Sequence, residues 1–354
     1  MFNISDIDKN LRVEHRLSDD VRATLEFYDV EQAPFSIYGV FREGDSFVRM
    51  PKAVAHDVSG DVEALNCHTA GGRIRFTTDS KRIAVVTACQ NNKGMGHIAL
   101  AGVCGFDIYA DYNGIRRYYG TCVPPVGFKD GFESIVAFPD ASNRTVTVNM
   151  PLYNGVYKVY IGVDKGSTVK SAEPLIQQPV VYYGSSITQG GCASRPGNAY
   201  QAIIHSKLKT DFINLGFSGS AKGEAAMMNY IAGLDMSAFI YDYDHNAPTA
   251  EHLAATHQSG YKTVRNSHPL IPIIMMTRPQ FYPTKEEIER KRIVYKTYCE
   301  AVANGDDNVY FVDGSDLIGS DVAEHALVDN CHPTDLGFYF MAKKLFPIIS
   351  SLVK

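Results

Sequence analysis

Two patterns of apolar and polar positions divide the chain near residue 170. Before that point, short runs rich in β-branched and aromatic residues alternate with turn-forming Gly, Pro, Asn and Asp. Runs of that length and spacing are typical of antiparallel strands and predict an all-β sandwich. The Asn113-Gly114 pair predicts a tight hairpin within it. The expected strands cover residues 35–41, 72–78, 82–90, 105–114, 133–139, 144–151 and 158–163.

Beyond residue 170, apolar runs of strand length alternate with segments of helical spacing. This alternation predicts an α/β fold, with a parallel sheet covered by helices on both faces and ligands at the carboxyl ends of the strands. The expected strands are 179–186, 211–219, 237–244, 270–279 and 308–314, and the expected helices are 199–209, 223–234, 286–304 and 336–353.

A polar segment rich in turn formers, residues 164–178, lies between the two patterns. We therefore predict a β-sandwich domain over residues 1–170 and an α/β domain over residues 171–354. The connector is short, so the two domains should touch rather than swing on a tether.

Composition narrows the classes of partner. The chain has 34 basic and 39 acidic residues among 354, a net charge of −5, which gives no footprint for nucleic acid. No stretch approaches the roughly 18 apolar residues of a membrane span, so no membrane partner is expected.

Seven cysteines without a CxxC pair indicate free thiols. The amino terminus lacks the apolar core of a signal peptide, which predicts a cytoplasmic protein, or a periplasmic or secreted one if a signal has been removed.

Two segments far apart in the sequence could together activate a hydroxyl group. Ser186 lies among small residues directly after the apolar residues 179–183, at the end of the predicted strand 179–186, and Asp329 precedes His332 by three residues just before the last helix. A serine hydroxyl becomes a nucleophile when an imidazole takes its proton and a third group orients that imidazole. Taken separately, the first segment could be a plain turn, and the second a capping aspartate beside a surface histidine.

Two further strand ends could stabilise negative charge. Gly219 ends the strand 211–219 and could present a backbone amide without a side chain in the way. Asn246 follows the strand 237–244 and offers a neutral side-chain donor. Either one alone is more often ordinary turn chemistry.

Together and in this order, the four segments resemble the four sequence blocks of the SGNH hydrolases, also called the GDSL lipase and acylhydrolase superfamily. The resemblance covers roughly residues 179–352, about half of the chain. It implies a serine nucleophile (Ser186), an oxyanion hole (the Ser186 and Gly219 amides and the Asn246 side chain), a base (His332) and the carboxylate that orients it (Asp329).

The sequence departs from the family pattern at two positions. Ser185 stands where the first block has aspartate, which puts the rigidity of that loop in doubt more than the activity. Asp244 replaces the glycine of the third block, and His245 stands beside the asparagine. We interpret His245 as a structural residue at the strand end, with contact to substrate as the alternative.

Other side chains are weaker candidates. Arg278 ends a predicted strand and could hold a substrate oxygen or pair with a nearby carboxylate. Tyr183 precedes the serine loop and could line the substrate pocket. Cys331 adjoins His332 but is interpreted as a bystander thiol, and His252 and His257 lack the spacing of a zinc protease. No metal or organic cofactor is expected.

The resemblance implies ester hydrolysis through an acyl-enzyme, with activity that rises near pH 6 to 7 because the base must be deprotonated.

A β-sandwich ahead of such a domain is similar to bacterial carbohydrate esterases that have a jelly roll in that position and act on O-acetylated sugars. An oligosaccharide in a pocket fits better than a long chain on an open platform, because the sequence has no tryptophan for sugar stacking. A short-chain lipid or general acyl esterase is the alternative, and a decayed, carbohydrate-binding hydrolase is the second. The sugar, the acyl position and the oligomeric state are not given by the sequence.

Overall fold

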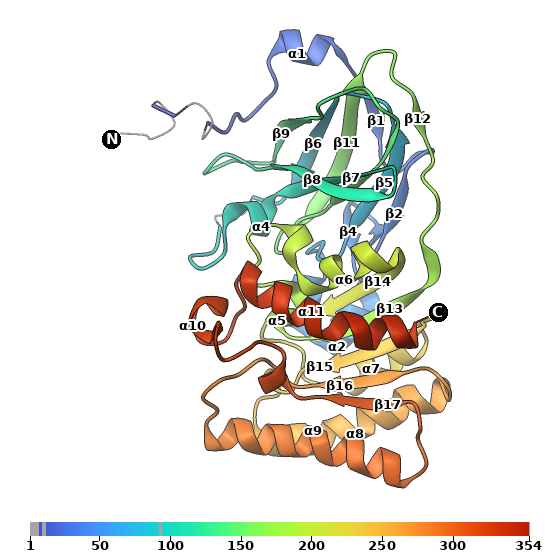
Figure 1. The fold of residues 1–354 in the computed structure, drawn as a ribbon, viewed down its shortest axis with the longest axis vertical. Coiled ribbons are helices and arrows are strands. Elements are labelled where there is room, and N and C mark those ends of the chain that lie inside the picture. The colour runs from blue at the N-terminus through green and yellow to red at the C-terminus, as the bar shows by residue number, and fades with distance from the viewer. Residues whose placement is uncertain (1–6, 9–11, 92–93, 354) are drawn as a thin grey trace.

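The computed structural model describes residues 7–8, 12–91 and 94–353 and divides into an antiparallel front part and a parallel rear part (Figure 1). In its described residues, the front part holds two larger antiparallel sheets, with strand orders β1-β11-β6-β9 and β12-β5-β10-β7-β8, where β2 also pairs with β5, and a two-stranded antiparallel sheet of β3 and β4. Its strands are β1 (Leu25–Asp29), β2 (Ser36–Tyr38), β3 (Phe41–Glu43), β4 (Ser46–Val48), β5 (Arg73–Thr78), β6 (Arg82–Cys89), β7 (Phe106–Tyr112), β8 (Ile115–Cys122), β9 (Gly131–Ala137), β10 (Arg144–Asn149), β11 (Val156–Asp164) and β12 (Val169–Lys170).

The predicted hairpin is present between β7 and β8. Asn113 and Gly114 both have positive φ angles, 49° and 77°, as the turn between twisted antiparallel strands requires. Short helices interrupt the front strands, and the sequence analysis did not predict them. They are α1 (Asp19–Ala23), α2 (Lys52–Val58), α3 (Gly60–Asn66) and α4 (Leu100–Cys104).

The rear part contains a five-stranded parallel sheet of order β14-β13-β15-β16-β17. Every strand predicted there is present, and the fold class predicted from the sequence is confirmed. The strands are β13 (Ile176–Gly184), β14 (Thr210–Gly216), β15 (Ala238–Asp242), β16 (Ile273–Met276) and β17 (Val309–Val312).

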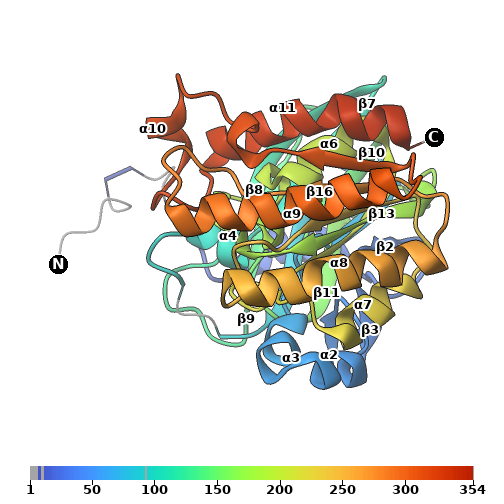
Figure 2. The same ribbon diagram turned by 90° about the horizontal axis from the view of Figure 1, so that it is seen from below.

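Helices cover both faces of this sheet. Figure 2 shows α6 and α11 on one side, and α7 and α8 on the other with α2 and α3 beside them. The predicted helices are all present, whereas α8 was not predicted. The α-helices are α5 (Ser186–Gln189), α6 (Tyr200–Leu208), α7 (Ala225–Ala232), α8 (Ala250–Ser267), α9 (Lys285–Ala303), α10 (Ala323–Ala326) and α11 (Asp335–Leu352), and the 3-10 helices are η3 (Pro196–Asn198) and η4 (Gly314–Asp316).

The two faces of the sheet belong to two apolar clusters. Along β13, Val180 and Tyr182 pack in the cluster that contains α6, α11 and the sandwich core, whereas Val181 and Tyr183 pack in the cluster that contains α7, α8 and α9. Successive residues of a strand point to opposite faces, which accounts for this division. None of the helices in the described residues is long and apolar enough to cross a membrane.

Side chains of the front part reach into the loops at the carboxyl edge of the rear sheet. The buried Arg49 guanidinium donates to the carbonyl oxygens of Asn214 and Gly216 at the end of β14. In the opposite direction, the buried Gln189 amide donates to the Leu152 carbonyl at 3.1 Å. The two parts therefore share polar contacts next to the loops that carry the candidate residues.

Candidate active site

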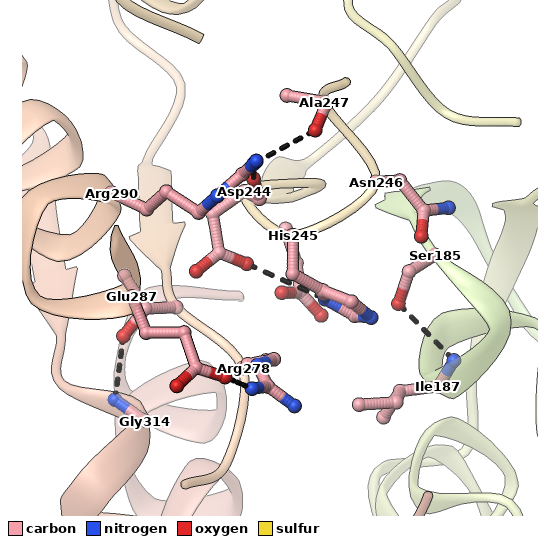
Figure 3. A network of polar contacts seen from close by, with 12 residues as sticks. Ser185, Ile187, Asp244, His245, Asn246, Ala247, Arg278, Glu287, Arg290 and Gly314 are labelled. Atoms are coloured by element: carbon pink, nitrogen blue, oxygen red, sulfur yellow. Dashed lines mark hydrogen bonds and ion pairs between the residues drawn. The ribbon is translucent and has the colours of Figure 1, made fainter. Parts of the chain in front are cut away.

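The loop after β13 is shaped by close backbone packing and by a serine cap. A Cβ atom on Gly184 would lie 2.1 Å from the Asp242 carbonyl oxygen, so no larger residue fits there. Ser185 is the N-cap of α5, and its hydroxyl accepts a hydrogen bond from the Ile187 amide at 3.2 Å (Figure 3). The departure from the family aspartate thus leaves a residue that still caps the helix.

Three predicted residues form one line of hydrogen bonds, here called the serine line. The Ser186 Oγ lies 2.8 Å from His332 Nε2, and His332 Nδ1 lies 2.7 Å from Asp329 Oδ2. Ser186 is 5% exposed, and the Asp329 side chain is 42% exposed. The hydroxyl, imidazole and carboxylate are therefore placed as a proton relay requires.

A tight turn holds the carboxylate end of the serine line. The Asp329 Oδ1 atom accepts hydrogen bonds from the amides of His332 at 2.8 Å and Cys331 at 3.2 Å. Burial raises the pKa of Asp329, but the hydrogen bonds from His332 and Cys331 outweigh it and hold that pKa below its usual range. Thr334 is the N-cap of α11, and its hydroxyl accepts a hydrogen bond from the Gly337 amide at the end of the turn.

Two of the three predicted oxyanion donors, Gly219 and Asn246, lie on neighbouring loops. The Asn246 Nδ2 donates to the Phe217 carbonyl at 3.1 Å, which joins its loop to the one carrying Gly219. Gly219 has a φ of +68°, and a Cβ built there would meet nothing within 4 Å. The glycine is therefore required by its backbone angle rather than by lack of space, and the space beside it is open.

The glycine loop is also tied to the serine loop. The Gln189 Oε1 accepts a hydrogen bond from the Ser218 amide at 3.0 Å. Within the described part of the chain, the Gly219 amide donates no hydrogen bond, so it is available to a ligand.

His245 belongs to a second line of the same residue types, the cysteine line: Cys331, His245 and Asp244. The His245 Nε2 lies 3.8 Å from Cys331 Sγ, and Nδ1 lies 3.8 Å from Asp244 Oδ1. Burial lowers the pKa of His245, but the facing carboxylate and sulfur outweigh it and raise that pKa to about 9. Burial raises the pKa of Cys331, and its contact with His245 lowers it below the ordinary value. Among the described residues, His245 therefore contacts Cys331 of the turn before α11 and lies beside Asp244 of its own loop.

Arg278 and Tyr183 have partners of their own. Arg278 forms an ion pair with Glu287 of α9, which is the local alternative of the sequence analysis (Figure 3). Tyr183 is 0% exposed, and its hydroxyl accepts from the Gly223 amide at 2.9 Å and donates to Glu224 at 3.3 Å. The prediction that Tyr183 lines the substrate pocket is wrong, because its side chain points to the α7 face of the sheet.

Sequence reasoning missed the residues that the front part contributes. The Tyr153 hydroxyl donates to the Ser186 carbonyl oxygen at 3.2 Å. The ring of His97, from the loop before α4, lies 5.8 Å from the ring of His332 between centroids. Neither residue belongs to a motif, and both lie more than 30 positions from Ser186, so no sequence pattern signalled them.

The chain matches two known families in sequence. Residues 177–350 match the GDSL-like Lipase/Acylhydrolase family, and residues 25–169 match the N-terminus of Esterase_SGNH_hydro-type proteins. No curated protein sequence matches the chain.

Solved structures with the same fold cover nearly the whole chain. A Bacteroides ovatus protein classed as a GDSL-like lipase is 27% identical, with a TM-score of 0.84 over 93% of this chain and 99% of its own. The salicylyl-acyltransferase SsfX3 of a tetracycline biosynthetic pathway is 17% identical, with a TM-score of 0.77 over 93% and 98%. A family two carbohydrate esterase of Cellvibrio japonicus is 12% identical, with a TM-score of 0.60 over the same shares.

These matches agree with the geometry of the loops at the carboxyl edge of the rear sheet. Both halves of the sequence match the two parts of one type of protein, and the chain belongs to the GDSL-like lipase and acylhydrolase family, the SGNH hydrolases.

Proposed function

We propose that the protein is a serine esterase that hydrolyses short-chain O-acyl esters, O-acetyl groups on carbohydrate foremost, through an acyl-enzyme. The observation that carries the proposal is the serine line, in which hydrogen bonds of 2.8 Å and 2.7 Å connect the hydroxyl, the imidazole and the carboxylate. Such a line turns a weakly nucleophilic hydroxyl into an attacking group.

In the first half of the reaction, His332 Nε2 takes the proton of Ser186 as Oγ attacks the acyl carbon. The Asp329 carboxylate accepts the hydrogen bond from Nδ1 and stabilises the imidazolium that forms. The Ser186 and Gly219 amides and the Asn246 side chain donate to the oxyanion. The imidazolium then passes its proton to the leaving alcohol, which departs and leaves the acyl-enzyme.

In the second half, His332 takes a proton from water, and the resulting nucleophile attacks the acyl carbon. Collapse of the second tetrahedral intermediate returns the proton to Ser186 Oγ and releases the carboxylic acid. The water, the ester and the three side chains of the serine line account for every proton, so the mechanism needs no further group.

Two observations support carbohydrate as the alcohol part. The chain shares its two-part architecture with the family two carbohydrate esterase of Cellvibrio japonicus. An acetyl xylan esterase of Butyrivibrio proteoclasticus also matches over 93% of this chain, with a TM-score of 0.55. A short-chain lipid or general acyl ester is the alternative substrate class for the same residues.

Acetate release tests both parts of the proposal. We expect wild-type protein to release acetate from acetylated xylo- and manno-oligosaccharides and from para-nitrophenyl acetate, with lower kcat/KM on para-nitrophenyl octanoate. Ser186→Ala should lose at least about 1000-fold in kcat. Ser351→Ala, which changes an exposed serine of α11, is the matched control. Equal rates for wild type and Ser186→Ala would refute the serine mechanism, and a preference for the octanoate would refute the carbohydrate assignment.

A further inference from the structure

A cluster of nitrogen and sulfur atoms lies across the boundary of the front and rear parts. His97, Cys192 and His332 each offer one ligand atom, and these atoms lie within 4.8 Å of one another. His97 comes from the loop before α4, Cys192 from the turn after α5, and His332 from the turn before α11. It is the one such cluster among the residues that the structure describes.

The donor set selects a class of metal. Two imidazoles and one thiolate are ligands that Zn²⁺ and related borderline cations prefer, whereas Mg²⁺ and Ca²⁺ prefer oxygen. Tetrahedral zinc with bonds of about 2.0 to 2.3 Å holds its ligand atoms roughly 3.3 to 3.6 Å apart. The longest of these separations must therefore contract by roughly 1.2 to 1.5 Å. The exposed His97 side chain, on a loop, can supply that movement.

We propose that His97, Cys192 and His332 form a binding site for Zn²⁺ or a similar transition-metal ion, and that the bound ion inhibits the enzyme. The inhibitory part rests on the proposed esterase function, because His332 is the base of that mechanism. Three protein ligands leave the fourth position to a solvent molecule.

Coordination of the metal ion by either ring nitrogen of His332 removes this imidazole from its catalytic role. The Nε2 atom is hydrogen-bonded to Ser186 and Nδ1 to Asp329, so both nitrogens already serve the serine line. Coordination through Nε2 leaves the Asp329 hydrogen bond in place, which matches the usual carboxylate partner of a metal-bound histidine. On binding, the Cys192 thiol becomes a thiolate and releases its proton to solvent.

Binding is tested without reference to activity. Purified full-length protein, freed of metal with a chelator and then dialysed, is titrated with Co²⁺ and with Zn²⁺. We expect one ion per chain and, for Co²⁺, a thiolate-to-metal charge-transfer band in the near ultraviolet. His97→Ala and Cys192→Ser should weaken Zn²⁺ binding at least about tenfold, and Cys192→Ser should abolish the band.

His15→Ala and Cys299→Ser change an exposed histidine and an exposed cysteine elsewhere and should bind as wild type does. Absence of binding to wild type, or equal binding by His97→Ala, overturns the site. Because Cys192 is buried, folding of its variant is checked by thermal unfolding. If Cys192→Ser fails to fold, the variant of the exposed His97 decides whether the site exists.

Inhibition is tested by para-nitrophenyl acetate hydrolysis in low-micromolar Zn²⁺. Wild type should lose activity and regain it with a chelator, and His97→Ala should require at least about tenfold more Zn²⁺ for the same loss. Metal binding with unchanged hydrolysis would overturn the inhibitory role. Metal binding by a protein with no esterase activity on any ester would instead overturn the proposed function and leave the site standing.

Discussion

The serine line and the cysteine line place the same kinds of group in two neighbouring regions, yet their geometry differs. In the serine line, consecutive groups lie 2.8 and 2.7 Å apart, which are hydrogen-bond distances. In the cysteine line, the 3.8 Å between His245 Nδ1 and Asp244 Oδ1 is too long for a nitrogen–oxygen hydrogen bond, whereas the 3.8 Å between Cys331 Sγ and His245 Nε2 still allows a long hydrogen bond to sulfur. Only the serine line can therefore pass a proton from one group to the next over its whole length.

The charges of the two lines differ as well. The pKa of His245, raised to about 9, keeps its imidazole protonated at neutral pH, and the lowered pKa of Cys331 favours the thiolate beside it. The cysteine line therefore already holds an imidazolium at rest, whereas the proposed mechanism forms an imidazolium in the serine line only during the reaction. The same residue types therefore do not fix a role, because the distances between the groups decide what they can do.

The largest expected difference between the two lines is in kcat when the aspartate of each line is replaced by asparagine. Asp329→Asn keeps the size of the side chain but loses the charge that stabilises the imidazolium. We expect a fall in kcat of roughly 100- to 10,000-fold. Asp244→Asn should lower kcat less than tenfold. Steady-state rates on para-nitrophenyl acetate measure both, and equal losses would show that the comparison is wrong.

Two adjacent residues offer a second test. Asn246→Ala removes an oxyanion donor and should cost about 100- to 1000-fold in kcat, with KM nearly unchanged. His245→Gln, one position earlier, should stay within about tenfold of wild type. If His245→Gln matched the loss in Asn246→Ala, the imidazole of residue 245 would have a direct part in the reaction.

Asp242, at the end of β15, should make stability depend on pH. Burial and the nearby Asp244 raise its pKa to about 7, and its Oδ2 accepts from the Thr188 hydroxyl at 3.1 Å. A carboxyl whose pKa is raised by folding leaves the free energy of unfolding unchanged below its unfolded pKa near 4. Above that pH it lowers the free energy of unfolding, and the loss grows until the pH passes about 7. Asp242→Asn should therefore raise the free energy of unfolding by a few kcal/mol at most at pH 8 and leave it unchanged at pH 4. Urea titrations at the two pH values measure this, and an equal gain at both would contradict it.

The smallest expected effect concerns thiol reactivity. His245→Gln removes the group that lowers the pKa of Cys331, so the rate of Cys331 alkylation by iodoacetamide should fall several-fold at pH 7. Peptide mass spectrometry follows Cys331 and the exposed Cys299 in the same sample. Cys299 is the internal control, and a faster reaction at Cys331 in the variant would argue against the charged pair.

The serine line could be predicted because its members end predicted strands or adjoin the last helix. In a parallel sheet, the carboxyl ends of the strands meet at one edge, so residues 146 positions apart, such as Ser186 and His332, can come together there. The helices α2 and α3 were not predicted because each has only seven residues, too few for an apolar pattern of helical period to stand out.

Other features had no signal in the sequence. The prediction for Tyr183 failed because alternation along a strand shows which residues share a face of the sheet, but not which helices cover that face. His97 contacts His332 across more than 200 positions, and only the packed arrangement of the front and rear parts joins them.

The hydrogen bond from the Tyr153 hydroxyl to the Ser186 carbonyl has a consequence for protein engineering. A fragment cut at the connector would lose the phenol that donates to the Ser186 carbonyl from the other half. Exchanging the front half for an unrelated β-domain would remove the same hydrogen bond, even if the new partner packed well. A design that is to keep this support of Ser186 must therefore carry both halves together.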